Sequence, residues 1–175
     1  SRAVGARDGQ PARPAVSAGI TLSDNALENE RRQLAAARRK ARHYAVQALY
    51  QWAITGNYLA DIEQQFIEEF DFRGADTGYF REMLHGVPAD LAAIEAAMEP
   101  HLDIALEKLG PVERAVLRIA VWELEARPDV PYRVVLSEAI ALAKKFGAAE
   151  SHRFVNGVLD KVARDLRPAE TGRAR

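Results

Sequence analysis

A run of basic residues joined directly to an apolar helix has the clearest chemistry in this sequence. Arg38-Arg39-Lys40-Ala41-Arg42 continues without glycine or proline into residues 43–52, which end at Trp52. If the second part is helical, the first part is helical too, so its cations are held on an ordered scaffold. Ordered cations beside aromatic rings suit phosphates and single-stranded bases. The competing interpretation is a basic helix start that only keeps the surface soluble.

Charge is unevenly distributed, although the formal net charge is only −1. From Arg31 to Arg42 every charged residue is a cation. Between residues 61 and 107 acidic residues predominate, and only Arg73 and Arg81 oppose them. One end of the protein should therefore attract an anionic partner that another face repels, which would orient that partner.

The residue types needed for catalysis or metal binding form no recognisable site. The chain has no cysteine, which excludes disulfides, thiolate nucleophiles and cysteine metal sites. Its histidines are scattered, and it has no glycine-rich phosphate loop, nucleophile elbow or dinucleotide fingerprint. The neighbouring carboxylates Glu68-Glu69 and Glu123/Glu125 fall in helical stretches and are interpreted as solvated surface. We therefore expect a protein that is not an enzyme and needs no cofactor or metal.

The sequence shows no membrane or export signal. No apolar stretch reaches the ~20 residues that a membrane-spanning helix needs. The start, Ser1 to Ile20, lacks the apolar centre of a signal peptide. We expect a cytoplasmic protein that does not contact membranes.

Apolar residues recur at helical spacing along most of the chain. The spacing predicts helices over residues 41–55, 59–70, 79–98, 102–109, 111–126, 132–146 and 149–166. Pro88 should kink or split the third of these, and the helix over 111–126 is apolar on nearly every side, as the buried centre of a bundle would be. The fold class is therefore all-α, a compact bundle of about seven helices.

The ends of the chain differ from this pattern. Residues 1 to about 22 are rich in Gly, Ala, Pro and Arg and are expected to be disordered. A helix start is expected at Ser23 or Asp24, and residues 26–40 are helix-prone, so they either extend the first helix or fray. We divide the chain into an extension that is disordered or partly helical (1–33), a helical domain (34–168) and a flexible tail (169–175).

Gly157 lies inside the last predicted helix, where glycine costs about 1 kcal/mol relative to alanine. Asn156-Gly157 alone predicts a hairpin turn, but the helical spacing of the flanking apolar residues overrides that signal. The simplest compensation is close approach of another helix, so we expect Gly157 to be packed.

Three stretches together resemble the bacterial transcription antitermination factor NusB family. They are Arg38 to Arg42 with Ala45-Val46-Gln47-Ala48-Leu49-Tyr50, then Glu113 to Ala120 with Glu123-Leu124, and finally Val130-Pro131-Tyr132, Glu138-Ala139-Ile140, Ala143 to Gly147 and Phe154 to Asp160. The resemblance covers about Ala36 to Pro168. It implies two small helical subdomains packed across each other, and a function in letting RNA polymerase pass terminators.

The resemblance also implies partners. Family members bind the boxA element of nascent ribosomal or phage leader RNA as a single strand. They bind it together with a small-subunit ribosomal protein that doubles as the elongation factor NusE, in a complex with RNA polymerase and other Nus factors. Some relatives are dimers that cover the RNA surface, so a homodimer is an option for this chain too.

Carried onto this sequence, the resemblance implies two sets of contact residues. The RNA contacts fall on Arg38, Arg39, Lys40 and Arg42, on Gln47 and Tyr50, and at the start of the last helix on Glu150, Ser151, His152 and Phe154. The NusE-like partner is expected at Glu107, Glu113, Arg114 and Arg118. For Tyr50 and Phe154, core packing is an equal alternative, and for Glu113 an equal alternative is a first-turn acid that interacts only with the helix dipole.

The chain departs from the family pattern at two points, and other functions stay open. Lys40 stands where arginine is common, which keeps the charge but loses the fork geometry. The leader, Ser1 to Gln33, is longer than expected, and it either adds RNA affinity through Arg31 and Arg32, masks the site or is inert. The alternatives to antitermination are a helical protein–protein adaptor, the RNA-binding module of an RNA methyltransferase, and a basic amphipathic helix on an anionic membrane.

Overall fold

A computed structural model describes residues 16–172, and no strand occurs within them. Seven α-helices and two single 3₁₀ turns follow one another in this range, which confirms the all-α bundle. The helices are α1 (Val16–Thr55), α2 (Leu59–Glu69), α3 (Thr77–Ala89), α4 (Leu91–Met98), α5 (Pro111–Ala126), α6 (Tyr132–Phe146) and α7 (Ser151–Leu166). The 3₁₀ turns are η1 (Glu99–His101) and η2 (Leu106–Lys108).

Helix α1 begins earlier than the sequence pattern predicts. It starts at Val16 instead of Ser23 or Asp24, because adding residues to a formed helix costs far less than nucleating one. Residues 1–15, the larger part of the segment expected to be disordered, lie outside the described residues. Helix α1 ends where Gly56 adopts a positive φ of 66°.

Two boundaries in the middle of the chain follow from its prolines. Pro88 lies in the last turn of α3, and the helix ends one residue later, so the predicted helix over 79–98 is split into α3 and α4 as expected. The predicted helix over 102–109 is wrong, because only the turn η2 forms there. Ala105 and Leu109 adopt extended conformations on either side of η2, so the helical conformation is interrupted within this segment.

The described chain forms two units, residues up to Ala35 and residues Ala36–Arg175. The first unit is a helical segment of α1 with exposed side chains at Leu27 and Leu34. Its Arg32 and Glu28 form an exposed ion pair of 3.0 Å, which contributes little to stability.

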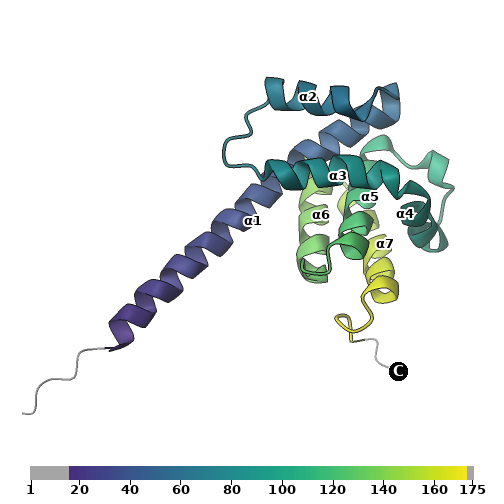
Figure 1. Ribbon diagram of the computed structural model, residues 1–175. Coiled ribbons are helices and arrows are strands. Elements are labelled where there is room, and N and C mark those ends of the chain that lie inside the picture. Colours follow the sequence, from purple (N-terminus) through teal and green to yellow (C-terminus); the bar gives the residue numbers. More distant parts are fainter. Residues whose placement is uncertain (1–15, 173–175) are drawn as a thin grey trace, which may run out of the picture. The chain divides into compact units, whose positions relative to one another are not determined.

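The second unit is built around α5. Every residue from Ala115 to Leu124 is buried, which confirms the central position predicted for this helix. Helices α5, α6 and α7 pack side by side, and α3 crosses them (Figure 1). One continuous hydrophobic core connects these helices. Within residues 16–172 no helix is both long and apolar enough to cross a bilayer.

Gly86 and Gly157 have opposite surroundings. A Cβ on Gly86 would lie 2.4 Å from Nε1 of the Trp122 side chain, so the lack of a side chain at Gly86 allows α3 to pack closely against α5. A Cβ on Gly157 would meet nothing within 4 Å, and the residue is exposed on α7. The expectation that Gly157 is packed against another helix is therefore wrong, and the close approach occurs at Gly86.

Candidate nucleic-acid interface

One face of α1 is fixed against the core and thereby positions the opposite face. Its buried stripe consists of Ala41, Tyr44, Ala45, Ala48 and Leu49. The hydroxyl of Tyr44 donates a hydrogen bond of 2.8 Å to the carbonyl of Asp71. Side chains spaced three or four residues apart then share the opposite face. Arg39, His43, Gln47 and Tyr50 follow this spacing.

The three consecutive cations 38–40 point in different directions around α1 and differ in their partners. Arg38 lies 3.8 Å from Asp76 and 3.9 Å from Asp129, beyond hydrogen-bond distance, and its Nε is buried without a hydrogen-bond partner among the described residues. Arg39 is exposed and donates to Glu138 at 3.1 Å. Lys40 donates through Nζ to the carbonyl of Arg73 at 2.6 Å. The exposed guanidinium of Arg39 is thus open to a ligand, whereas the Nε of Arg38 is enclosed by the protein.

Arg42 cannot contact RNA from its position. Its side chain is 3% exposed and donates hydrogen bonds of 2.7 and 2.8 Å to the two carboxylate oxygens of Glu123, which is also buried. The hydroxyl of Tyr79 donates to the same carboxylate at 2.7 Å. The expectations of an RNA-contacting Arg42 and a solvated Glu123 are therefore wrong, because the two charges neutralise each other inside the core.

The ring of Tyr79 lies within a cluster of guanidinium groups. Those of Arg38, Arg42 and Arg127 lie 4.8, 5.5 and 5.0 Å from the ring centre, within cation–π distance. Burial and the charge of Glu123 raise the pKa of the Tyr79 hydroxyl above its usual range, so it stays protonated and donates. This cluster fixes the base of the basic segment.

Between α1 and α6 lies a depression of about 470 Å³, which we call the basic groove. Its charged lining is Arg39 and Lys40 from α1 with Glu138 and Lys145 from α6, and His43 also lines it. Burial first, and then the charge of Lys145, lowers the pKa of His43. The neutral form of His43 is therefore favoured in the free protein.

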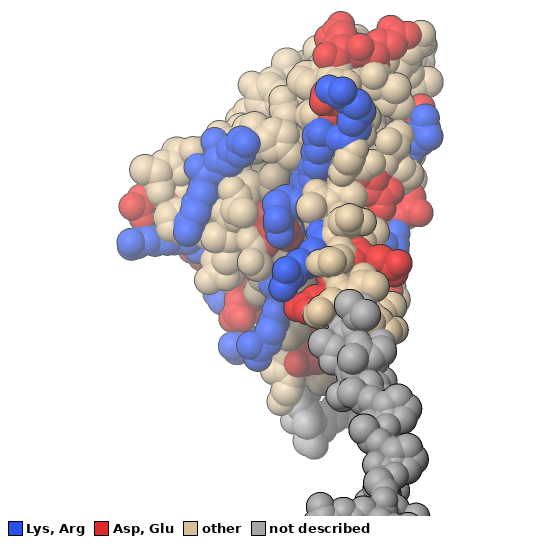
Figure 2. All heavy atoms as spheres, turned by 90° about the vertical axis from the view of Figure 1, so that its left-hand side faces the viewer, with Lys and Arg blue, Asp and Glu red and all other residues tan. Residues whose placement is uncertain are grey.

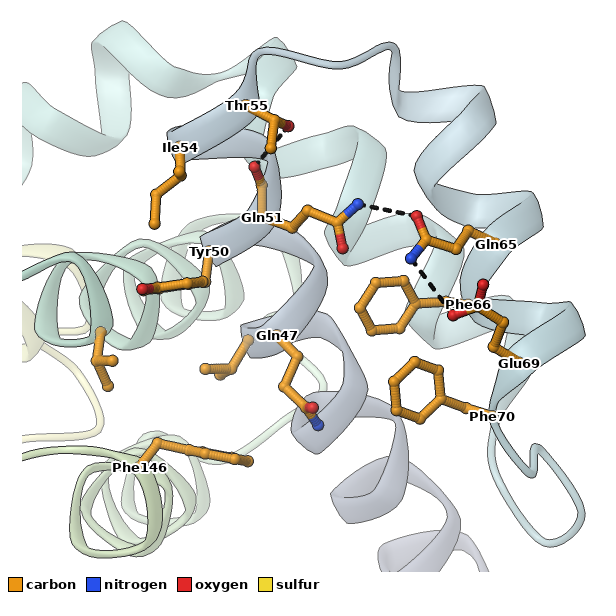
Figure 3. A pocket seen from close by; sticks show the side chains of 12 residues that line it. Gln47, Tyr50, Gln51, Ile54, Thr55, Gln65, Phe66, Glu69, Phe70 and Phe146 are labelled. Atoms are coloured by element: carbon orange, nitrogen blue, oxygen red, sulfur yellow. Dashed lines mark hydrogen bonds between the residues drawn. The ribbon is translucent and has the colours of Figure 1, made fainter.

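Gln47 and Tyr50 line a second depression of about 480 Å³, which we call the aromatic groove. Figure 3 shows Phe66 of α2 and Phe70, the residue that follows α2, on one side of α1, and Phe146 of α6 on the other. Gln51 donates to Gln65 across the groove at 2.9 Å. Tyr50 is 37% exposed, so its ring lies at the surface instead of filling the core.

Some side chains at the start of α7 are exposed, and others are buried or hydrogen-bonded. Glu150 is exposed and pairs with Arg153 at 3.1 Å. Ser151 is buried and donates its hydroxyl to Glu113. Phe154 is half-buried, and together with Glu150 and Ser151 it lines a shallow depression of about 330 Å³. Nδ1 of His152 is buried without a hydrogen-bond partner among the described residues.

The residues expected to bind a protein partner are not equally available. Glu107 is exposed at η2, and Glu113 is partly exposed. Arg114 donates to the carbonyl of Leu106, which ties η2 to α5. Arg118 is only 7% exposed and donates to Glu95 at 2.8 Å, so its assignment to a partner surface is wrong.

Figure 2 shows Lys and Arg side chains forming a broken stripe on one face of the molecule, with acidic side chains beside it. The sequence pattern missed Lys145 and Phe146 as site residues, although both belong to the motif Ala143 to Gly147. The signal that could have found them is their position in the last turn of α6, shortly before the start of α7. No group of three or more His, Asp or Glu side chains within residues 16–172 could hold a metal ion.

Comparison with known proteins identifies relatives of most of the second unit. A family model described as the NusB family matches residues 39–164. The transcription antitermination protein NusB of Yersinia enterocolitica is 59% identical over 132 residues, which are 75% of this chain and 96% of that protein. The Yersinia pestis protein of the same name is 58% identical over the same shares of both chains.

Solved structures agree with this assignment. NusB of T. maritima has a TM-score of 0.65 at 32% identity and covers 78% of this chain and 97% of its own. A structure of antitermination factors NusB and NusE in complex with dsRNA has a TM-score of 0.65 at 26% identity, covering 73% and 96%. The family-model match over residues 39–164 includes the basic segment from Arg39, residues that line both grooves beside α1, and the start of α7. On this evidence the chain belongs to the NusB family.

Proposed function

We propose that this protein is a non-catalytic RNA-binding factor in transcription antitermination. It binds boxA-type single-stranded RNA together with a NusE-like small-subunit ribosomal protein, and through that complex it joins RNA polymerase and other Nus factors. It acts in the cytoplasm, where nascent ribosomal RNA is made. Membership of the NusB family over residues 39–164 is the observation that carries this proposal.

The RNA path that we propose follows the outer face of α1. Arg38, Arg39 and Lys40 neutralise backbone phosphates at its start. Gln47 and Tyr50 lie farther along the same face beside the aromatic groove, where a ring can stack on a base for about 1–3 kcal/mol. The path continues to the start of α7.

At α7, Glu150 and Phe154 offer two kinds of base contact. The exposed Glu150 carboxylate can accept hydrogen bonds from base amino groups or a ribose hydroxyl. The half-buried ring of Phe154 keeps one edge available to a base while its other side packs on the core. Ser151 and His152 act by shaping this turn, since Ser151 is buried against Glu113.

The protein partner has its proposed site at the η2–α5 junction. The carboxylates of Glu107 and Glu113 face a basic ribosomal protein there, and opposite charges across an interface speed association. Arg114 holds η2 in position for this contact.

The helical domain that carries both surfaces spans residues 34–168, with 1–33 as an extension and 169–175 as a tail. Residues 173–175 of that tail lie outside the described residues.

The burial of α1 argues against a membrane-surface helix. The apolar stripe of α1 from Ala41 to Leu49 is buried in the core, so it is not free to enter a lipid interface.

The Yersinia relatives match this chain over 96% of their length, so the similarity covers almost the whole of a transcription antitermination protein.

Fluorescence anisotropy with labelled RNA tests the proposal. We would compare a boxA-like single strand, a scrambled strand of equal length and a duplex, each with and without the NusE-like ribosomal protein. We expect the boxA-like strand to bind most tightly and the partner to tighten it further. Equal weak binding to all three RNAs, unchanged by the partner, would refute the proposal.

A further inference from the structure

We propose that the basic groove between α1 and α6 is a phosphate-binding site for the RNA backbone, with Lys145 and Arg39 as its two cationic ligands. This inference rests on the proposed RNA-binding function and deepens it. It adds α6 to an interface for which the sequence motifs indicated only α1 and the start of α7.

The groove brings cations from two helices together. Arg39 and Lys40 approach it from α1, and Lys145 approaches it from the last turn of α6. Of these three, Lys145 is exposed and forms no ion pair or hydrogen bond with the described part of the chain. An exposed ammonium group without a carboxylate partner beside a second cation is favourable for a phosphate.

Among the described residues that line the basic groove, Glu138 is the one carboxylate, and it would compete with a bound phosphate for Arg39. Its side chain is 13% exposed and accepts from the guanidinium of Arg39 at 3.1 Å. Arg39 itself is 62% exposed, so it can turn to a phosphate, at the cost of separating it from the mostly buried Glu138 carboxylate. An incoming phosphate would compete with Glu138 for Arg39, and Lys145 would offset the repulsion between phosphate and Glu138.

The groove is continuous with the proposed base-binding surface. The rings of His43, which lines the basic groove, and Phe146, which lines the aromatic groove, lie 4.8 Å apart between centres. Lys145 and Phe146 are also neighbours in sequence. A strand with a phosphate in the basic groove would therefore have its next bases beside Gln47 and Tyr50.

A matched pair of substitutions tests the role of Lys145. Lys145→Gln removes a groove cation, and Lys144→Gln removes the same charge from an exposed neighbour that does not line the groove. Binding of the boxA-like RNA by the full chain would be measured from 0.05 to 0.4 M salt. We expect Lys145→Gln to weaken binding about fivefold at 0.1 M salt and to lower the salt slope by about 0.7, with Lys144→Gln unchanged.

A third variant should act in the opposite direction. Glu138→Gln removes the competing charge and frees Arg39, so we expect tighter RNA binding, a result that loss of folding cannot imitate. Lys145→Gln and Lys144→Gln with equal affinity and slope, while the wild type binds RNA, would overturn the phosphate site alone. A wild type without salt-dependent RNA binding would overturn the proposed function and this inference together.

Discussion

Arg42 and Glu123 form a buried ion pair in which two guanidinium nitrogens donate to the two carboxylate oxygens at 2.7 and 2.8 Å. The pair joins α1 to the central helix α5, and Tyr79 of α3 completes it through its hydroxyl. Burial alone would lower the pKa of Arg42, but the hydrogen bond and the charge of Glu123 outweigh it and raise that pKa. The pair therefore sets the position of the basic segment without contacting RNA.

Removal of either partner should destabilise the fold strongly. Glu123→Gln leaves the Arg42 charge buried without a counter-ion. Arg42→Met leaves the Glu123 carboxylate charge buried without one. We expect each variant to lower the free energy of unfolding by about 3–5 kcal/mol. Urea unfolding followed by circular dichroism measures this.

The double variant Arg42→Met/Glu123→Leu provides the control. Since it removes both buried charges, we expect it to be more stable than either single variant. If the two single losses simply added in the double variant, the pair would not be coupled as the structure indicates.

Arg39 should matter for RNA binding and little for folding. Its side chain is 62% exposed, so Arg39→Glu leaves the core intact. We expect at least about fivefold weaker binding of the boxA-like RNA at 0.1 M salt, because a phosphate contact is replaced by a repulsive charge. The measurement is anisotropy, with circular dichroism confirming an unchanged helix content.

Arg81→Glu is the matched control for this substitution. Arg81 is 52% exposed, pairs with Glu63 at 3.6 Å and lines neither groove. The same charge reversal there should leave RNA affinity nearly unchanged. An equal loss in both variants would mean that only the overall charge of the protein matters.

Helical periodicity was enough to predict most of the fold, because each helix buries a stripe with regular spacing. It could not place individual charges. Arg42 and Glu123 both look like surface residues in their own helices, and only the crossing of α1 and α5 brings them together inside the core. Likewise, Gly86 and Gly157 are both helical glycines, and the approach of Trp122 to one of them depends on tertiary packing.

The proposed RNA interface was predictable to a similar extent. Arg39 and Tyr50 were recognisable from their motif, since both lie on one face of one helix. The basic groove was not, because Lys145 joins it from a helix about a hundred residues later in the chain. A motif shows which residues matter but not which of them face one another.

His43 should couple RNA binding to pH. Burial and Lys145 hold its pKa below the usual 6.5, so the unfolded chain takes up a proton first as the pH falls through 6.5. The contribution of His43 to stability is thus complete above pH 6.5 and declines below it. A phosphate in the basic groove would raise the same pKa, so RNA binding takes up a proton and should strengthen between pH 7.5 and 6.

The groups that face His43 decide this behaviour. They are the cations Arg39, Lys40 and Lys145, the carboxylate Glu138 and the neutral rings of Tyr44 and Phe146. Titration by NMR of free and RNA-bound protein would measure the pKa, and we expect it to rise in Lys145→Gln even without RNA. His43→Gln should remove part of the pH dependence of affinity, and an identical pH profile in that variant would contradict the coupling.

The two glycines give the last prediction, because they should respond oppositely to the same substitution. Gly86→Ala places a Cβ 2.4 Å from Nε1 of the buried Trp122 side chain, so we expect a loss of about 1–3 kcal/mol in the free energy of unfolding. Gly157→Ala meets nothing within 4 Å and replaces glycine inside α7, so we expect a gain of about 0.5–1 kcal/mol. Thermal and urea unfolding of both variants would measure the two changes side by side. A destabilised Gly157→Ala would mean that α7 is packed there after all, and an unchanged Gly86→Ala would mean that the Trp122 ring can move aside without cost.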